Sequence, residues 1–292
     1  MKILVSSVEG NTQLLDGGAM FGNAPRAVWS KWAPPDEQGR IKLACRSLLV
    51  EIDGVRILCE TGIGNFFDEK MRKRFGVQES ENRLLENLSS LGVSEQDIDF
   101  VILSHLHFDH AGGLLNGYSD AQRKGRKLLF PDAQYVVGEL ALHRCRKPHA
   151  RDRASYIDGM ADLLEASGRL IVVPEAVLKH SQLPEPIEFR YSEGHTPGQM
   201  LTVIKGDIDT MVFLGDLVPG HHWVHLPITM GYDRFPELLI DEKKQLYSDM
   251  KDESWYGFYT HDEKFAGSRI SRADNGKFLP QDLKECFIRK AI

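Results

Sequence analysis

The sequence predicts a layered α/β fold, with two sheets packed face to face and helices outside. Apolar segments with the two-residue alternation of strands occur in both halves of the chain, and a few segments with helical three- and four-residue spacing interrupt them. Two strand-rich halves bury their apolar faces by packing sheet on sheet. No repeat or low-complexity linker divides the 292 residues. We therefore expect one domain over 1–292, with halves of roughly 1–175 and 176–292.

The individual elements follow from these periodicities. Strands are expected at 2–6, 43–52, 55–59, 100–104, 134–137, 170–173, 187–191, 200–205, 210–214 and 256–260. Helices are expected at 79–91, 138–146, 156–166 and 236–251, and Gly92 supplies a stop signal for the first of them.

Composition and charge restrict the class of protein. The chain is 42% hydrophobic and 27% charged, which excludes a disordered protein, and no apolar run approaches the roughly 20 residues that span a bilayer. The N-terminus has too few apolar residues for a secretory signal, so we expect a cytoplasmic protein without membrane contact. A net charge of −6 favours a small-molecule partner over nucleic acid. The scattered cysteines indicate reduced thiols, at Cys45, Cys59, Cys145 and Cys286.

The most informative segment is a strand that runs into a histidine-rich turn. Within six residues it contains His105, His107, Asp109 and His110. Imidazole nitrogen and carboxylate oxygen are ligands that zinc takes at about 2.0–2.2 Å. Strand alternation directs His105 and His107 the same way, so Asp109 and His110 can turn toward a second ion. Gly112 and Gly113 follow, and we expect them to let the backbone turn tightly.

Three further candidate ligands each come just after an apolar strand: His195, Asp216 and His261. A lone histidine in a polar loop would be an ordinary surface residue. Here the candidate ligands lie at the ends of four predicted strands, and hydrolytic sites are commonly built from residues at strand ends on a rigid scaffold. The pattern therefore indicates a metal site rather than scattered histidines.

Together these motifs resemble the metallo-β-lactamase-fold superfamily: H-x-H-x-D-H at 105–110, G-H-T-P-G at 194–198, G-D at 215–216 and T-H at 260–261. The resemblance implies a four-layer αβ/βα sandwich. It implies His105, His107 and His195 on a first metal, Asp109, His110 and His261 on a second, and Asp216 bridging both. One departure is Glu60, which stands where the family usually has aspartate and which we expect to support the ligand loop from behind.

The resemblance also implies a mechanism. Two divalent ions, zinc in the first place and iron or manganese otherwise, would share a hydroxide that attacks a small ester or lactone. Asp109 and His261 are the expected catalytic residues, with Asp109 passing a proton to the departing group.

The sequence is similar to the lactonase and organophosphate-hydrolase-like branch of this superfamily. An apolar substrate pocket is expected from residues after the first strand and after Asp216: Met20, Phe21, Trp29, His221, His222 and Trp223. Core packing is an equally good interpretation of the aromatic members. Quorum-signal lactonases carry a tyrosine shortly after the bridging aspartate, and Val218 and Pro219 stand there instead.

Other functions stay open at this stage. The superfamily includes phosphoester and phosphotriester hydrolases and nucleases, and a nuclease would need a basic arm such as 123–127 or 144–153, although such runs are usually solvated surface. Glyoxalase II is disfavoured because about thirty residues follow His261, too few for its helical C-terminal region. A dinuclear-metal sensor without hydrolytic activity is the alternative from another class, because these ligands also hold iron or manganese. A homodimer is also left open.

Overall fold

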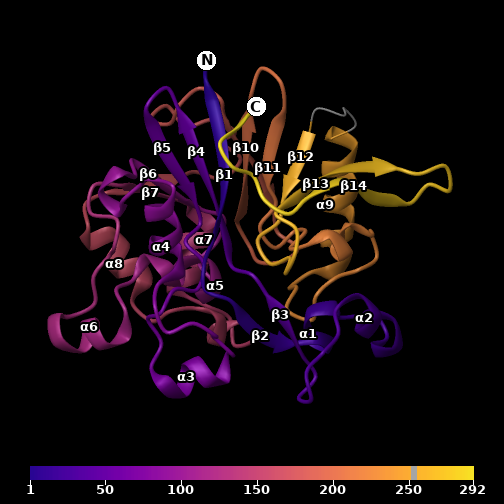
Figure 1. The fold of residues 1–292 in the computed structure, drawn as a ribbon, viewed down its shortest axis with the longest axis horizontal. Coiled ribbons are helices and arrows are strands. Elements are labelled where there is room, and N and C mark those ends of the chain that lie inside the picture. Colours follow the sequence, from indigo (N-terminus) through magenta and orange to yellow (C-terminus); the bar gives the residue numbers. More distant parts are fainter. Residues whose placement is uncertain (251–254) are drawn as a thin grey trace.

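The computed structural model describes residues 1–250 and 255–292 and confirms the layered α/β class. Its first sheet has the strand order β15-β1-β4-β5-β6-β7-β8 (Figure 1). The pairs from β1 to β5 are antiparallel, and those from β5 to β8 are parallel. The strands are β1 (Ile3–Glu9), β4 (Arg46–Ile52), β5 (Val55–Cys59), β6 (Phe100–Leu103), β7 (Gln134–Gly138), β8 (Leu170–Val173) and β15 (Lys290–Ala291).

The second sheet has the order β14-β13-β12-β11-β10-β9, and its one parallel pair among the described strands joins β11 to β12. Its strands are β9 (Ile187–Ser192), β10 (Gln199–Lys205), β11 (Thr210–Phe213), β12 (Trp255–Phe258), β13 (Gly267–Arg272) and β14 (Phe278–Lys284). A separate two-stranded ribbon pairs β2 (Gln13–Asp16) with β3 (Arg40–Leu43).

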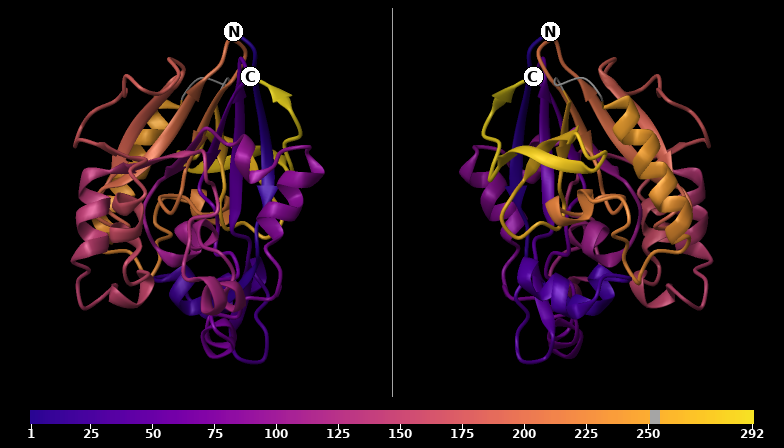
Figure 2. Two further views of the ribbon diagram at one scale, coloured as in Figure 1. Left: turned by 90° about the vertical axis from the view of Figure 1, so that its left-hand side faces the viewer. Right: turned by 90° about the vertical axis from the view of Figure 1, so that its right-hand side faces the viewer.

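Helices cover both outer sides of the paired sheets (Figures 1 and 2). The helices are α1 (Gly17–Phe21), α2 (Arg26–Trp32), α3 (Glu69–Arg74), α4 (Arg83–Ser90), α5 (Phe108–Ala111), α6 (Tyr118–Lys124), α7 (Glu139–Arg146), α8 (Met160–Ala166) and α9 (Pro236–Asp249). Short 3₁₀ turns are η1 (Glu95–Asp97), η2 (Gly112–Leu114), η3 (Arg153–Ser155) and η4 (His221–Val224). No helix in the described ranges has the length and apolar character that crossing a membrane requires.

Three apolar clusters hold these layers together. The middle cluster lies between the sheets and combines first-sheet residues such as Val5 and Leu48 with Phe213 of the second. A second cluster packs the outer face of the first sheet against α4, α7 and α8. A third packs α9 and α1 on the outer face of the second sheet. The chain therefore forms four layers, in the order helices, first sheet, second sheet and helices, and one apolar cluster fills the space between each pair of neighbouring layers. One domain over 1–292 stays a prediction.

The predicted boundaries differ from the structure where tertiary contacts decide them. The expected strand 43–52 is interrupted at Ala44, because the amides of Ala44 and Arg46 donate to the carbonyls of His261 and Thr260. The helix expected from 156 begins only at Met160, since Gly159 has a φ of 76° and cannot continue a helix. The helix expected over 236–251 ends at Asp249, and position 251 lies outside the described residues.

A buried arginine ties the second sheet to the first. Arg46 of β4 is 2% exposed and pairs with Glu9. Its guanidinium also donates to three carbonyls of the loop after β12, those of Tyr259, Asp262 and Phe265, each at 3.1 Å. Because this loop contains His261, Arg46 sets the position of a candidate ligand across the joint between the sheets.

Replacing Arg46 by methionine should destabilise the fold, because carbonyl oxygens buried by the guanidinium lose their donors. We expect the free energy of unfolding to fall by at least about 2 kcal/mol, measured by denaturant titration. Arg83→Met is the matched control, since Arg83 forms an exposed pair with Glu86 and should cost no more than about 1 kcal/mol. Equal losses in both variants would contradict the role assigned to Arg46.

Candidate metal centre

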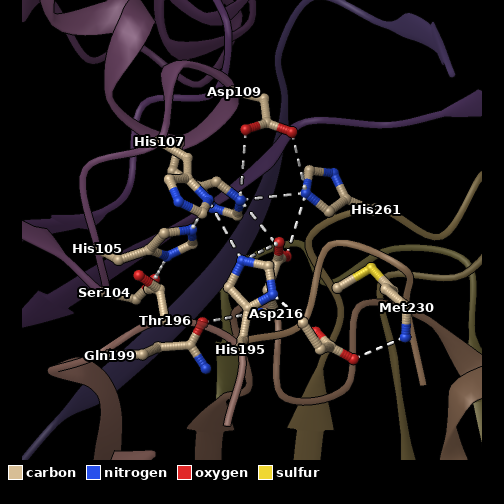
Figure 3. Close-up of polar contacts among 12 residues, drawn as sticks. Ser104, His105, His107, Asp109, His195, Thr196, Gln199, Asp216, Met230 and His261 are labelled. Atoms are coloured by element: carbon tan, nitrogen blue, oxygen red, sulfur yellow. Dashed lines mark hydrogen bonds and ion pairs between the residues drawn. The ribbon is translucent and has the colours of Figure 1, made fainter. Parts of the chain in front are cut away.

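The candidate ligands converge at one edge of the two sheets. His105 follows β6 of the first sheet, whereas His195, Asp216 and His261 follow β9, β11 and β12 of the second. Figure 3 shows His107, Asp109, His195 and His261 directed toward one another around Asp216. The structure thus brings together the side chains that the sequence placed far apart.

The first group consists of three imidazoles and one carboxylate. His107 Nδ1 lies 3.0 Å from His105 Nε2 and 3.3 Å from His195 Nε2, and His195 Nε2 lies 3.2 Å from Asp216 Oδ2. All four residues are buried. Ligand atoms about 2.0–2.1 Å from a tetrahedral ion lie roughly 3.3 Å apart, so this spacing suits a single metal ion.

The second group lies on the other side of the Asp216 carboxylate. His110 Nε2 and His261 Nε2 are 3.2 Å apart, and Asp216 Oδ1 lies 3.4 Å and 3.2 Å from them. Asp109 completes the group, with its carboxylate oxygens 3.7 Å from His110 Nε2 and 3.6 Å from His261 Nε2. The two oxygens of Asp216 therefore face different groups of imidazoles.

The hydrogen bonds of the far ring nitrogens show why this arrangement fits a cation. His261 Nδ1 lies 2.7 Å from the carbonyl oxygen of Ala44, which can only accept, so Nδ1 carries the hydrogen and Nε2 of the neutral ring has a lone pair. His110 Nδ1 donates in the same way to Glu60 Oε2 at 2.7 Å. In two neutral rings the lone pairs would then face each other across 3.2 Å, which is repulsive unless a proton or a metal cation lies between them. Among the described residues, buried Asp216 Oδ1 also lacks a well-aligned donor.

The electrostatics divide the imidazoles into two kinds. Burial lowers the pKa of His105 and His107 well below the ordinary value, and neighbouring imidazoles add to this effect. Burial also opposes charge on His110 and His261, but nearby carboxylates, Asp216 and Asp109 among them, outweigh it and raise both pKa values well above normal. His105 and His107 therefore offer neutral nitrogen ligands. His110 and His261 attract positive charge, as does His195, because Asp216 and Asp233 outweigh burial and raise its pKa.

Glu60 supports the ligand loop from behind. It is buried, accepts a hydrogen bond from His110 Nδ1 and a second from the hydroxyl of Ser104, which itself lies 2.9 Å from His105 Nδ1. Its φ of 63° is unusual for a residue with a Cβ. From this position the longer side chain contacts the His110 ring directly and the His105 ring through Ser104.

The two glycines after His110 provide space rather than an unusual turn. Neither Gly112 nor Gly113 has a positive φ. A Cβ on Gly113 would collide with the carbonyl oxygen of Thr61, directly after Glu60. The expectation of a tight turn is thus replaced by close approach of two loops, which brings Glu60 against the ligands.

Two supporting residues were not anticipated from the sequence. Asp233 is buried and accepts from His195 Nδ1 at 2.9 Å and from the amide of Met230 at 2.6 Å. Gln13 Nε2 donates to Asp109 Oδ2 at 2.8 Å. Both come from loops or strands far from the histidine motifs, and no local pattern marks them. Only the tertiary fold identifies these contacts.

A cavity of 180 Å³ opens beside both ligand groups. It is lined by Leu15, Met20, Phe75, His107, Phe108, Asp109, Arg151, Ala154, Ser155, His195, Asp216, Met230, Tyr232 and His261. Small-molecule pockets usually measure about 300–1,000 Å³, so this cavity suits a small substrate or one part of a larger one.

The expected pocket residues are arranged differently from the prediction, and only Met20 lines this cavity. Phe21 stacks on Trp223 at 4.4 Å and on Trp29 at 5.8 Å within the core behind it. His222 stacks on Trp32, and His221 pairs with Asp262. Because the indole of Trp223 donates to the Met20 carbonyl, this aromatic cluster fixes Met20 rather than facing a substrate.

The basic run 144–153 is divided among different environments. Arg144 pairs with Asp152 at 2.7 Å, Arg146 pairs with Glu165, and Arg151 lines the cavity. In the other basic run, Arg123 and Lys124 contact Asp120 of the same helix. The structure therefore offers little support for a continuous basic arm.

Comparison with known proteins agrees with this geometry. Residues 40–117, which include the histidine motif, match the family model of the metallo-beta-lactamase superfamily. Over these residues the chain is similar to metallo-beta-lactamase superfamily domains. The αβ/βα sandwich described above is the fold expected of this superfamily.

The proteins that are similar to this chain include hydrolases. An N-acyl homoserine lactonase of Bacillus thuringiensis is 28% identical over 191 residues, which are 62% of this chain and 63% of the lactonase. The match thus spans less than two thirds of that relative. A probable metal-dependent hydrolase from Staphylococcus aureus has a TM-score of 0.83 and 27% identity, covering 99% of this chain and 98% of that one. The dizinc quorum-quenching lactonase AidC, at 19% identity and a TM-score of 0.71 over 96% of this chain and 95% of its own, shares the fold.

Replacing Asp233 by asparagine should weaken metal binding at the first group, because the amide reduces the charge that orients and polarises His195. We expect about a 10- to 100-fold loss of affinity, measured by competition with a chromophoric chelator. Asp241→Asn, at an exposed position of α9, is the matched control. Wild-type affinity in the Asp233 variant would contradict this positioning role.

Proposed function

We propose that the chain is a metal-dependent hydrolase that holds two divalent cations and acts on a small ester or lactone. The observation that carries this proposal is the placement of Asp216, whose two oxygens face separate groups of imidazoles. A structural zinc site needs only one closed set of four ligands. Two groups sharing one carboxylate beside a cavity favour catalysis instead.

The proposed ligands follow from the two groups. His105, His107 and His195 would hold the first cation, and Asp109, His110 and His261 would hold the second, with Asp216 shared. Nitrogen and oxygen donors suit zinc, and also iron or manganese. The dizinc composition of the lactonase AidC supports zinc as the first choice.

When bound, two such cations would lower the pKa of a water molecule and polarise the carbonyl of the substrate. The chain's own residues provide the rest. Gln13 donates to Asp109 Oδ2 and so fixes the carboxylate, which lines the cavity and is 13% exposed. From this position Asp109 can transfer a proton to the departing oxygen. His261, proposed as the other catalytic residue, is held by Ala44 and lines the same cavity.

The walls of the cavity indicate the kind of substrate. Leu15, Phe75 and Phe108 supply an apolar surface suited to a short acyl arm, and apolar walls also limit the access of bulk water. Val218, which stands where quorum-signal lactonases have tyrosine, is buried. Tyr232 lines the cavity from another loop instead. Burial, with Asp109 and Asp16 nearby, raises the pKa of Tyr232 to about 12, so it remains a hydrogen-bond donor at neutral pH.

The alternatives make different demands on the structure. A nuclease would need free basic side chains, but Arg144 and Arg146 are engaged in ion pairs. A sensor would use the same ligands and would not need the cavity. A cytoplasmic location, a homodimer and the absence of a nucleic-acid partner stay predictions.

Elemental analysis together with a substrate panel tests the proposal. We expect two divalent cations per chain and turnover of lactones or aryl esters that a chelator removes and added metal restores. The panel also includes a phosphotriester, a cephalosporin and a phosphodiester, which separate the branches of the superfamily. Bound metal without turnover of any panel member would move the sensor function to first place, and failure to bind metal would exclude both.

Replacing Asp109 by alanine should abolish turnover, because it removes both a cation ligand and the proposed proton carrier. We expect kcat to fall at least about 100-fold, while the free energy of unfolding of the metal-free protein changes little because almost no apolar core is lost. Asp120→Ala, in an exposed ion pair of α6, controls for the loss of a carboxylate. Unchanged turnover in the Asp109 variant would rule out the mechanism.

A further inference from the structure

Arg151 places a guanidinium in the wall of the cavity. Its Nη2 donates to the carbonyl oxygens of Gly231 at 2.7 Å and Asp233 at 3.4 Å. These carbonyls belong to the loop that contains Tyr232. Although Arg151 is an exposed residue, one end of its guanidinium is therefore anchored on the opposite loop.

The remaining donors of Arg151 have no protein partner in the described ranges. Nε and Nη1 make no hydrogen bond there, and no carboxylate of these residues forms an ion pair with the guanidinium. By contrast, Arg144, seven positions earlier, uses Nε and Nη2 on the carboxylate of Asp152. Arginine keeps its charge at any physiological pH. A fixed cation with free donors thus faces the space where substrate would lie.

The charge around the cavity leaves this cation uncompensated. Four buried or nearly buried carboxylates surround the imidazoles: Glu60, Asp109, Asp216 and Asp233. Their four negative charges would equal the positive charge of the two divalent cations in the proposed function, and this step rests on that proposal. Asp16 lies near enough to affect Tyr232 but forms no ion pair with Arg151 within the described ranges. The positive charge of Arg151 therefore remains available to a ligand.

We propose that Arg151 binds an anionic group of the substrate, and that the substrate is an ester or lactone whose acyl part carries a carboxylate. Because Nη2 is occupied by the two carbonyls, Nε or Nη1 would donate a charge-assisted hydrogen bond to one oxygen of a carboxylate. The cavity is small, so this group lies within a few bonds of the reacting carbonyl. Arg151 is thus a specificity-determining residue, separate from the groups that carry out hydrolysis.

Two aryl esters of nearly equal shape test this inference: 4-nitrophenyl butyrate and the mono-4-nitrophenyl ester of succinic acid, which differ by a methyl or a carboxylate at the end of the acyl chain. The metal-loaded wild-type protein should show the higher kcat/KM for the succinyl ester. In Arg151→Gln the ratio of the two kcat/KM values should fall about tenfold or more, and Arg151→Lys should retain part of it.

Arg153→Gln is the matched control, because Arg153 is exposed, lies on the same loop and does not line the cavity. A loss of the ratio in Arg151→Gln alone supports the inference. An unchanged ratio, or an equal fall in Arg153→Gln, overturns it.

If neither ester is hydrolysed, the proposed function fails on these substrates, and calorimetric binding of succinate and butyrate to the metal-loaded protein decides the inference separately. Succinate and butyrate can each bind a metal cation through one carboxylate. The ratio of their affinities therefore measures what the second carboxylate of succinate adds to binding. A succinate preference that disappears only in Arg151→Gln supports the role of Arg151, whereas a preference that is absent or unchanged overturns it.

Discussion

The buried carboxylate of Asp216 is the constraint around which the rest of this structure is arranged. It follows β11 in the second sheet and faces imidazoles contributed by both sheets. A buried charge without compensation is costly, so the surroundings must supply positive charge. Glu60, Asp233 and the Ala44 carbonyl engage the far nitrogens of three rings and turn their near nitrogens inward. The fold thereby directs electron pairs toward places where cations lower the energy.

The cavity beside this centre is built on a different principle. Its ligand side is rigid, because it rests on strand ends and buried hydrogen bonds. Its outer side comes from loops that hold one another, as when Arg151 donates to the Gly231 carbonyl. Met20 is fixed from behind by the aromatic cluster through Trp223. Candidate ligands on rigid elements, with walls formed by loops, would allow substrate preference to vary without disturbing the ligand geometry.

The sequence predicted the parts that depend on local pattern. The alternation of apolar residues located most strands of the two large sheets. The histidine motifs identified the candidate ligands, because each of these ligands follows a predicted strand. Contacts between distant segments could not be predicted in this way: Asp233 and Gln13 carry no motif, and Arg151 lies in a run that reads as ordinary charged surface. The aromatic residues after β2 matched a pocket and a core equally well, and only packing distinguishes the two. Strands β13 to β15 were missed because their alternation is weak.

Because the candidate ligands come from both sheets, a cation bound there would also act as a reversible cross-link. A cation held by His105 and His195, or by His110 and His261, joins elements that otherwise meet mainly through the apolar layer and the Arg46 contacts. Opening the sandwich then requires releasing the ion, so free metal raises the energy of opening by mass action. A chain made during metal shortage would open more often and be degraded sooner. The cellular abundance of this protein would therefore follow the metal supply even without regulation of its gene.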